Sequence, residues 1–135
     1  MEILQPYNTG ILIIGLSGFI LCIQLIVVDV AGVKSRHRPG FPITPDKNSF
    51  LFRSARAFAN TNESVTIFIV FMAFAILTLA DPVWVNRWAT LYFVGRLAHM
   101  ACYYAGIGLA RSASFVVSLV GLIGLFVIAL QAWMA

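Results

Sequence analysis

The stretch that decides the fold runs from Phe50 to Leu79 and reads FLFRSARAFANTNESVTIFIVFMAFAILTL. It is longer than the about 20 residues that a transmembrane helix needs. Yet it carries Arg56, Asn60 and Glu63 at positions i, i+4 and i+7. That spacing places the three side chains on one face of a helix. Polar groups at such depth normally face a bundle interior or a wet cavity, so they predict a functional site.

Three further apolar stretches are long enough to cross a bilayer: about Thr9 to Val33, Trp84 to Gly108, and Ser112 to Trp133. Of the 135 residues 61% are hydrophobic and 10% are charged, and the mean hydropathy is +0.93, which excludes an ordinary soluble domain. We therefore predict an all-α membrane protein with four transmembrane helices in an up-down bundle. Residues 1–135 form a single domain in this prediction, and lipid or other subunits complete its core.

Basic residues are distributed unevenly between the connections. The first connection contains Lys34, Arg36, Arg38, Lys47 and Arg53, whereas the second contains only Arg87. The positive-inside rule places the first connection in the cytoplasm and both termini on the non-cytoplasmic side. Three prolines and a glycine in residues 38–45 predict an extended, ordered loop that could cap the cytoplasmic face. This topology accounts for the basic loop, so we predict no nucleic-acid partner.

A second polar set lies on one face of the third stretch: Arg96, His99 and Tyr103, at i, i+3 and i+7. Counting about 1.5 Å per residue from the cytoplasmic helix ends places Glu63 and Arg96 at one level, roughly 18 to 20 Å deep. Asn60 falls near the depth of His99. Opposite charges at one depth predict an ion pair between Glu63 and Arg96, at the floor of a pocket.

The remaining polar groups are predicted to form the walls and mouth of that pocket: Arg56, Asn60, His99 and Tyr103 as walls, and Arg111 at the mouth. These polar sets contain three arginines but only one carboxylate, Glu63, and positive charge remains in excess even when Asp29 near the end of the first helix is counted. A purely structural network would neutralise itself. Because guanidinium binds carboxylate through two parallel hydrogen bonds, the site suits an anionic ligand with several carboxylates, such as a small acidic peptide.

The other polar or small residues of the spans are interpreted as packing residues. Cys22 and Cys102 lie within apolar stretches and predict neither a disulfide nor a metal site. Gln24 is predicted to make a hydrogen-bonding helix contact. A stripe of small residues in the last stretch predicts close helix packing: Ser114, Ser118 and Gly121.

Two strings carry a resemblance to a known family. RAFANTNE at residues 56–63 and GRLAHMACY at residues 95–103 resemble the signatures of the MAPEG family, the membrane-associated proteins in eicosanoid and glutathione metabolism. The first signature is Arg, three residues, Asn, two residues, Glu; the second has Arg and Tyr seven apart, with His between them in some members. The resemblance implies a homotrimer with glutathione bound between neighbouring subunits, in a pocket open to the cytoplasm.

The resemblance also implies roles for particular residues. Those that would bind glutathione or form its pocket are Arg56, Asn60, Glu63, Arg96, His99 and Tyr103. Arg111 resembles an arginine that stabilises the glutathione thiolate, and Ser112 would donate a hydrogen bond to it. Such groups lower the thiol pKa and favour the nucleophilic thiolate. The chain departs from the family at Ala59, where some members have a second arginine, and at Phe115, where many have tyrosine.

These observations lead to two hypotheses for function. The favoured one is a glutathione transferase or peroxidase in which the thiolate attacks a lipophilic electrophile or a lipid hydroperoxide. The alternative is a non-catalytic membrane protein that binds lipid or a partner and uses the polar residues for assembly. A proton or ion pathway is less favoured, because the polar residues stop about halfway across the bilayer.

Overall fold

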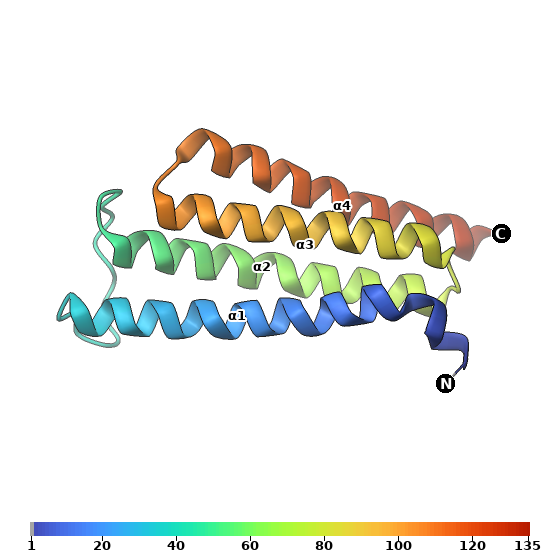
Figure 1. Cartoon of the computed structure of the whole chain (residues 1–135), viewed down its shortest axis with the longest axis horizontal. Helices are drawn as coiled ribbons and strands as arrows, with labels where there is room; N and C mark the ends of the chain where they lie inside the picture. The colour runs from blue at the N-terminus through green and yellow to red at the C-terminus, as the bar shows by residue number, and fades with distance from the viewer. Residues whose placement is uncertain (1) are drawn as a thin grey trace.

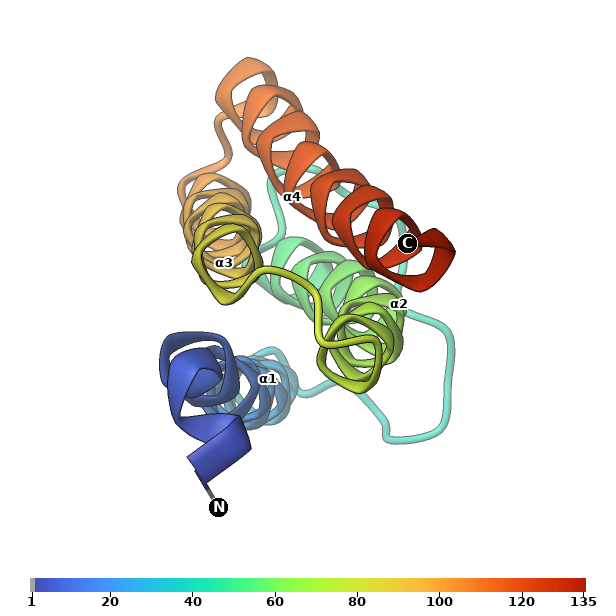
Figure 2. The same ribbon diagram turned by 90° about the vertical axis from the view of Figure 1, so that its right-hand side faces the viewer.

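Four long helices run side by side in alternating directions. The computed structural model describes residues 2–135, which contain no strand. A short 3-10 helix η1 (Glu2–Tyr7) is followed by α1 (Asn8–Lys34), α2 (Phe50–Leu77), α3 (Pro82–Ala105) and α4 (Gly108–Met134) (Figure 1). Seen along the bundle, α1 and α4 lie on opposite sides of the α2–α3 pair (Figure 2). The predicted up-down bundle of four helices is confirmed.

Three segments are long and apolar enough to cross a membrane: Glu2–Lys34, Phe50–Leu77 and Gly108–Met134. Helix α3, the remaining predicted span, is not among them, because two arginines, a histidine and an asparagine lower its mean hydropathy. Helix α3 nevertheless returns alongside α2 through the same thickness (Figure 1). Its two deepest polar side chains, Arg96 and His99, are only 4% and 3% exposed. Large apolar side chains on α1 and α4 remain exposed, as expected of lipid-facing helices. The chain is an integral membrane protein.

The helix ends have local causes in the sequence. Ser49 caps α2 by accepting a hydrogen bond from the Phe52 amide at 3.3 Å. Asp81 caps α3 by accepting from the Val83 amide at 2.8 Å, with Pro82 at the first helical position. At the other end of α3, Gly106 has a φ of 76°, which a glycine adopts without strain. Helix α4 therefore begins at Gly108, earlier than predicted, and Arg111 lies in its first turn.

The apolar core occupies the half of the bundle near the two chain termini. It contains the stacked pair of Phe68 and Tyr92, with ring centroids 4.3 Å apart. The other core residues include Ile13, Met72, Ala75, Val85, Ala89, Leu122, Leu125 and Ala129. The other half of the bundle contains the predicted site residues. Apolar side chains therefore pack the helices together in one half of the bundle, and the polar side chains lie in the other half.

Helices α3 and α4 approach each other at backbone distance. A Cβ atom on Gly121 would lie 2.6 Å from the Tyr92 backbone nitrogen, and one on Gly95 would lie 2.6 Å from that of Ser118. Ser118 and Gly121 are buried, so the predicted packing role of these small residues is confirmed. Ser114 is only half-buried and donates a hydrogen bond to the Ala110 carbonyl of its own helix.

The connection between α1 and α2 contains no helix, as its prolines predicted. Arg53 fixes its end: Nη1 donates to the carbonyls of Lys47 and Asn48, both at 2.9 Å. Nη2 of the same guanidinium donates to the Tyr104 carbonyl at 3.4 Å. Arg53 therefore belongs to the first turn of α2 rather than to the loop, and it joins the loop to the end of α3.

Candidate functional site

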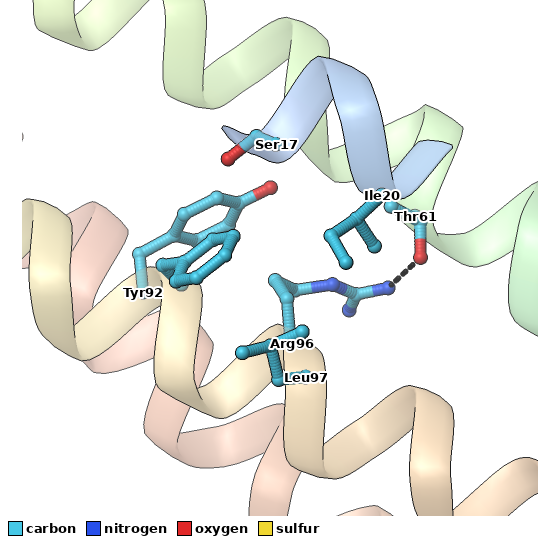
Figure 3. Close-up of a pocket in the computed structure, with 7 residues that line it drawn as sticks. Ser17, Ile20, Thr61, Tyr92, Arg96 and Leu97 are labelled. Carbon is cyan, nitrogen blue, oxygen red and sulfur yellow. Dashed lines mark hydrogen bonds between the residues drawn. The ribbon is translucent and has the colours of Figure 1, made fainter. Parts of the chain in front are cut away.

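Arg96 is the polar centre of the bundle. Its Nη1 donates to Asn60 Oδ1 at 2.8 Å, and its Nη2 donates to Thr61 Oγ1 at 2.9 Å. The close-up shows the guanidinium reaching from α3 to Thr61 on α2, with Ser17 of α1 on the far side of a small cavity (Figure 3). Arg96 thus joins α3 to α2 through two charge-assisted hydrogen bonds, which are stronger than neutral ones.

The predicted ion pair between Glu63 and Arg96 is wrong. Among residues 2–135 no ion pair joins them, and the guanidinium binds Asn60 and Thr61 instead. Each residue turns an α-helix by about 100°, so Glu63 points about 200° away from Thr61. Glu63 is accordingly exposed. Counting residues gave the depth to within one helical turn but did not give the direction of the side chain.

The first polar set is divided between the inside and the outside of the chain. Asn60 is half-buried, whereas Arg56 and Glu63 are exposed, and neither has a side-chain hydrogen bond within residues 2–135. Asn60 and Glu63 line a groove of ≈ 200 Å³ between α2 and α4. The rest of its lining is mostly apolar: Ser64, Ile67, Phe115, Ser118, Leu119 and Leu122. Arg56 and Glu63 thus lie on a face of α2 that a single copy of the chain leaves open.

The second polar set is continuous from α3 to the start of α4. The His99 ring meets the edge of the Tyr103 ring at 5.0 Å and lies 5.9 Å from the Phe115 ring. The Arg111 guanidinium carbon lies 4.8 Å from the centroid of the Tyr103 ring, which is a cation–π distance. Arg96, His99, Tyr103 and Arg111 therefore follow one path from the buried centre toward the end of the bundle.

That path ends in a second hollow, of ≈ 160 Å³. Its lining comprises Lys47, Phe52, Arg53, Cys102, Tyr103, Gly106, Gly108 and Arg111. Three of these side chains are cations, and the described lining contains no carboxylate. Of the three arginines from which the sequence predicted an excess of positive charge, only Arg111 lines this hollow, and the other two cations are Lys47 and Arg53. Such a hollow is electrostatically suited to an anion.

Ser112 is not part of this lining. It is exposed, and its hydroxyl donates to the Gly108 carbonyl of its own helix at 3.3 Å. Within one chain the structure therefore does not bring Ser112 into the hollow that contains Arg111. The two residues predicted to act on a thiolate point in different directions from the first turns of α4.

Several residues of the site were not predicted from the sequence. Thr61 follows Asn60 and provides the second acceptor for Arg96, and its position on the buried side of α2 was the available signal. Lys47 and Arg53 were interpreted only as topology signals, although both line the cationic hollow. Gln24 is fully buried, but the predicted hydrogen-bonding helix contact is wrong, because neither amide atom has a hydrogen-bond partner among residues 2–135. Cys22 and Cys102 are free thiols.

The structure is a helical membrane bundle with an arginine buried at its centre and a cationic hollow at one end. These features indicate a class of membrane protein. The MAPEG family model matches residues 11–131, nearly the whole chain, and the chain belongs to the MAPEG family. A comparison with curated protein sequences gives no significant match. The resemblance recognised from the two signature strings is thereby confirmed.

Proposed function

We propose that the protein is a glutathione-dependent membrane transferase or peroxidase that acts as a homotrimer. Glutathione would bind against the open face of α2, in contact with Arg56, Asn60 and Glu63. A neighbouring copy would close that face. The second substrate would be a lipophilic electrophile or a lipid hydroperoxide that enters from the bilayer. The site would open toward the cytoplasm, on the side of the basic first loop, with both termini on the opposite side.

The exposed charges of α2 are the observation that carries this proposal. Glu63 lies thirteen residues after Phe50, which is about 20 Å along the helix at 1.5 Å per residue. Arg56 is about 9 Å along the same helix. A charged side chain exposed to hydrocarbon is costly, so an exposed face of this kind requires a cover. A second copy together with an anionic ligand meets that requirement, whereas lipid chains do not.

The charge and chemistry of the site fit glutathione. This tripeptide has two carboxylates and a free amine, which match the exposed guanidinium of Arg56 and the carboxylate of Glu63. Arg111 and the neighbouring cations of the hollow provide positive charge for the thiolate, which cations favour over the thiol. The groove between α2 and α4 is mostly apolar and lies beside Asn60 and Glu63, as a lipophilic second substrate requires.

The resulting reaction is simple in outline. The bound thiolate forms a thioether with an electrophilic carbon and displaces that carbon's leaving group as an anion, or two glutathione molecules reduce a hydroperoxide to an alcohol and one water and leave as the disulfide. The chain would bind the tripeptide, hold Arg111 near the sulfur and exclude water with apolar side chains. Tyr103 keeps Arg111 in place through the ring contact at 4.8 Å.

Equilibrium binding of glutathione to the purified protein in lipid nanodiscs tests the proposal. The variants are Arg56→Ala and Arg111→Ala, and the matched control is Arg87→Ala, because Arg87 is an exposed arginine that stacks on Trp84 in the first turns of α3. Loss of one charged hydrogen bond, worth about 1.5 to 3 kcal/mol, should weaken binding by about 10- to 100-fold for Arg56→Ala. The control should bind like the wild type.

The results separate the two hypotheses for function. If the wild-type protein does not bind glutathione, the proposed glutathione-dependent function is wrong. Binding that survives Arg56→Ala would show that the ligand lies elsewhere. Binding without turnover of model electrophiles or hydroperoxides would favour the non-catalytic alternative, in which the fold binds lipid or a partner.

A further inference from the structure

Asp29 is an exposed carboxylate within the apolar helix α1. It lies five residues before the end of the helix at Lys34, which is about 7.5 Å along its axis. A carboxylate exposed to hydrocarbon is costly, and such a group normally pairs with an opposite charge. The residues one turn before and one turn after Asp29 on α1 contain no cation: Leu25, Ile26, Gly32 and Val33. A partner must therefore come from elsewhere.

Asp29 also points away from its own bundle. The buried residues nearest to it on α1 are Gln24 and Ala31. Each residue turns an α-helix by about 100°, so Asp29 points about 140° away from Gln24 and about 160° away from Ala31. Asp29 therefore cannot reach a partner through the interior of the same chain.

Arg56 points outward from α2 in the same way. It is exposed, and it lies about 100° around the helix from the buried Ala57 and about 140° from the buried Thr61. The residues one turn away from Arg56 on α2 contain no carboxylate: Phe52, Arg53, Ala59 and Asn60. Two exposed charges of opposite sign thus each lack a partner on their own helix.

The other arginines within the helices of this half of the bundle are already engaged. Arg53 donates to three backbone carbonyls, and Arg96 donates to two side chains of α2. Arg111 lies over an aromatic ring at the cationic hollow. None of these three is exposed, whereas Arg56 is. Arg56 is therefore the arginine best placed to meet Asp29.

Asp29 and Arg56 also match in depth. Arg56 lies six residues after the start of α2, about 9 Å along its axis, and both distances are counted from the end of the bundle that carries the α1–α2 loop (Figure 1). Side-chain bonds tilt toward the N-terminus of a helix, so Asp29 leans away from this end and Arg56 leans toward it. Copies related by rotation about the membrane normal keep every residue at its depth, so the two groups of neighbouring copies lie at one level.

We propose that Asp29 of a second copy of the chain forms an ion pair with Arg56. The contact joins α1 of one copy to α2 of the next, so it can repeat around a ring of copies. A guanidinium has five N–H donors, so Arg56 can bind Asp29 along one edge and a ligand carboxylate along another. The second copy thereby contributes a residue to the edge of the glutathione site, and this last part rests on the proposed function.

Crosslinking between two differently tagged forms of the full chain tests the pair. Both forms carry Cys22→Ser and Cys102→Ser; one adds Asp29→Cys and the other adds Arg56→Cys. The reagent is a short bismaleimide, because an aspartate and an arginine in contact lie further apart than the about 4.4 to 6.8 Å between Cα atoms that a disulfide allows. In membranes that contain both forms, we expect a covalent dimer that carries both tags.

In the matched control, Leu12→Cys replaces Asp29→Cys. Leu12 is also exposed on α1, but it lies seventeen residues earlier, about 25 Å along the helix. It should give no covalent dimer with Arg56→Cys. A control dimer of equal yield would overturn the pair. Absence of a dimer with Asp29→Cys, as expected if lipid covers this face, would also overturn it.

Charge reversal tests the same pair without cysteine variants. Asp29→Arg brings two arginines together, and the detergent-solubilised assembly should then dissociate at a protein concentration at least about tenfold higher, measured by analytical ultracentrifugation. Adding Arg56→Asp to the same chain restores opposite charges and should restore the dissociation of the wild type. An assembly that Asp29→Arg leaves unchanged, or that the double variant does not restore, would overturn the pair.

Glutathione binding separates the ion pair from the proposed function. If the wild type does not bind glutathione but the crosslink and the charge rescue are observed, the proposed function fails and the pair stands. If the wild type binds glutathione but neither the crosslink nor the rescue is observed, the pair fails and the proposed function stands.

Discussion

Substituting Gly121 by alanine should separate helices α3 and α4. The new Cβ would lie 2.6 Å from the Tyr92 nitrogen, 2.9 Å from the Tyr92 Cα and 3.0 Å from the Trp88 carbonyl oxygen. Ordinary contact begins at 3.4 Å, so the gap must widen by about 0.8 Å. All three atoms belong to the backbone of α3, and no side chain can rotate to make room. The whole contact between the two helices has to shift.

The size of the effect follows from two opposing terms. Overpacking a well-packed contact costs about 1 to 3 kcal/mol. Replacing glycine by alanine inside a helix contributes about 0.5 to 1 kcal/mol in the opposite direction. Because the conflict is with backbone, we expect a net loss of about 2 kcal/mol in the free energy of unfolding, or a fall of about 5 to 10 °C in Tm. Far-UV circular dichroism of the purified protein in detergent measures the change.

Gly18→Ala is the matched control for this substitution. Gly18 is also inside a long helix, but an added Cβ there has nothing within 4 Å. Only the stabilising effect of replacing glycine by alanine within a helix therefore remains. Its Tm should rise slightly or stay constant. If Gly121→Ala unfolds at the same temperature as Gly18→Ala, the close approach of α3 and α4 is not present in solution, and the reasoning is refuted.

Three further predictions concern hydrogen bonds and the groove. Thr61→Val removes the acceptor for Arg96 Nη2 and should cost about 1 to 3 kcal/mol in thermal unfolding, while Thr61→Ser should retain stability. Asn86→Ala removes the hydrogen bonds to the Gly10 amide at 2.9 Å and to the Pro6 carbonyl at 2.8 Å. Hydrogen exchange of the Gly10 amide should then become at least about tenfold faster. An unchanged exchange rate would contradict this prediction. Phe115→Tyr places a phenol in the groove beside Asn60, and turnover of a model electrophile should rise about tenfold; no increase would mean that the phenol does not reach the thiolate.

The sequence predicted the helices well, because three of the four follow from apolar length. The predicted start of the second helix at Phe50 is correct, and the predicted end at Leu79 differs by two residues from the observed Leu77. The larger error is at the start of the fourth helix, predicted at Ser112 and observed at Gly108. A glycine in the left-handed conformation makes the turn so short that little of the chain remains outside the helices.

The site was predicted less completely, because the depth of a side chain along its helix does not determine the direction in which the side chain points. Spacing correctly placed His99 and Tyr103 on one face, and their rings are in contact at 5.0 Å. It did not show that Glu63 faces away from α3, since direction depends on how each helix is rotated in the bundle. The apolar residues of α2 contained that information, since Ala57, Val65 and Phe68 mark a buried face that also includes Thr61. The residues opposite that face are those that a second copy of the chain covers in the function we propose.

A structure of the protein with glutathione in a lipid environment is the most direct test of the central claim, that the open face of α2 is a glutathione site between copies of the chain. We predict density for the tripeptide against Arg56, Asn60 and Glu63, with a carboxylate on the Arg56 guanidinium and a second copy closing the face. Arg111 should be the nearest cation to the sulfur. An assembly in which lipid covers Arg56 and Glu63, with glutathione absent or bound elsewhere, would contradict the account.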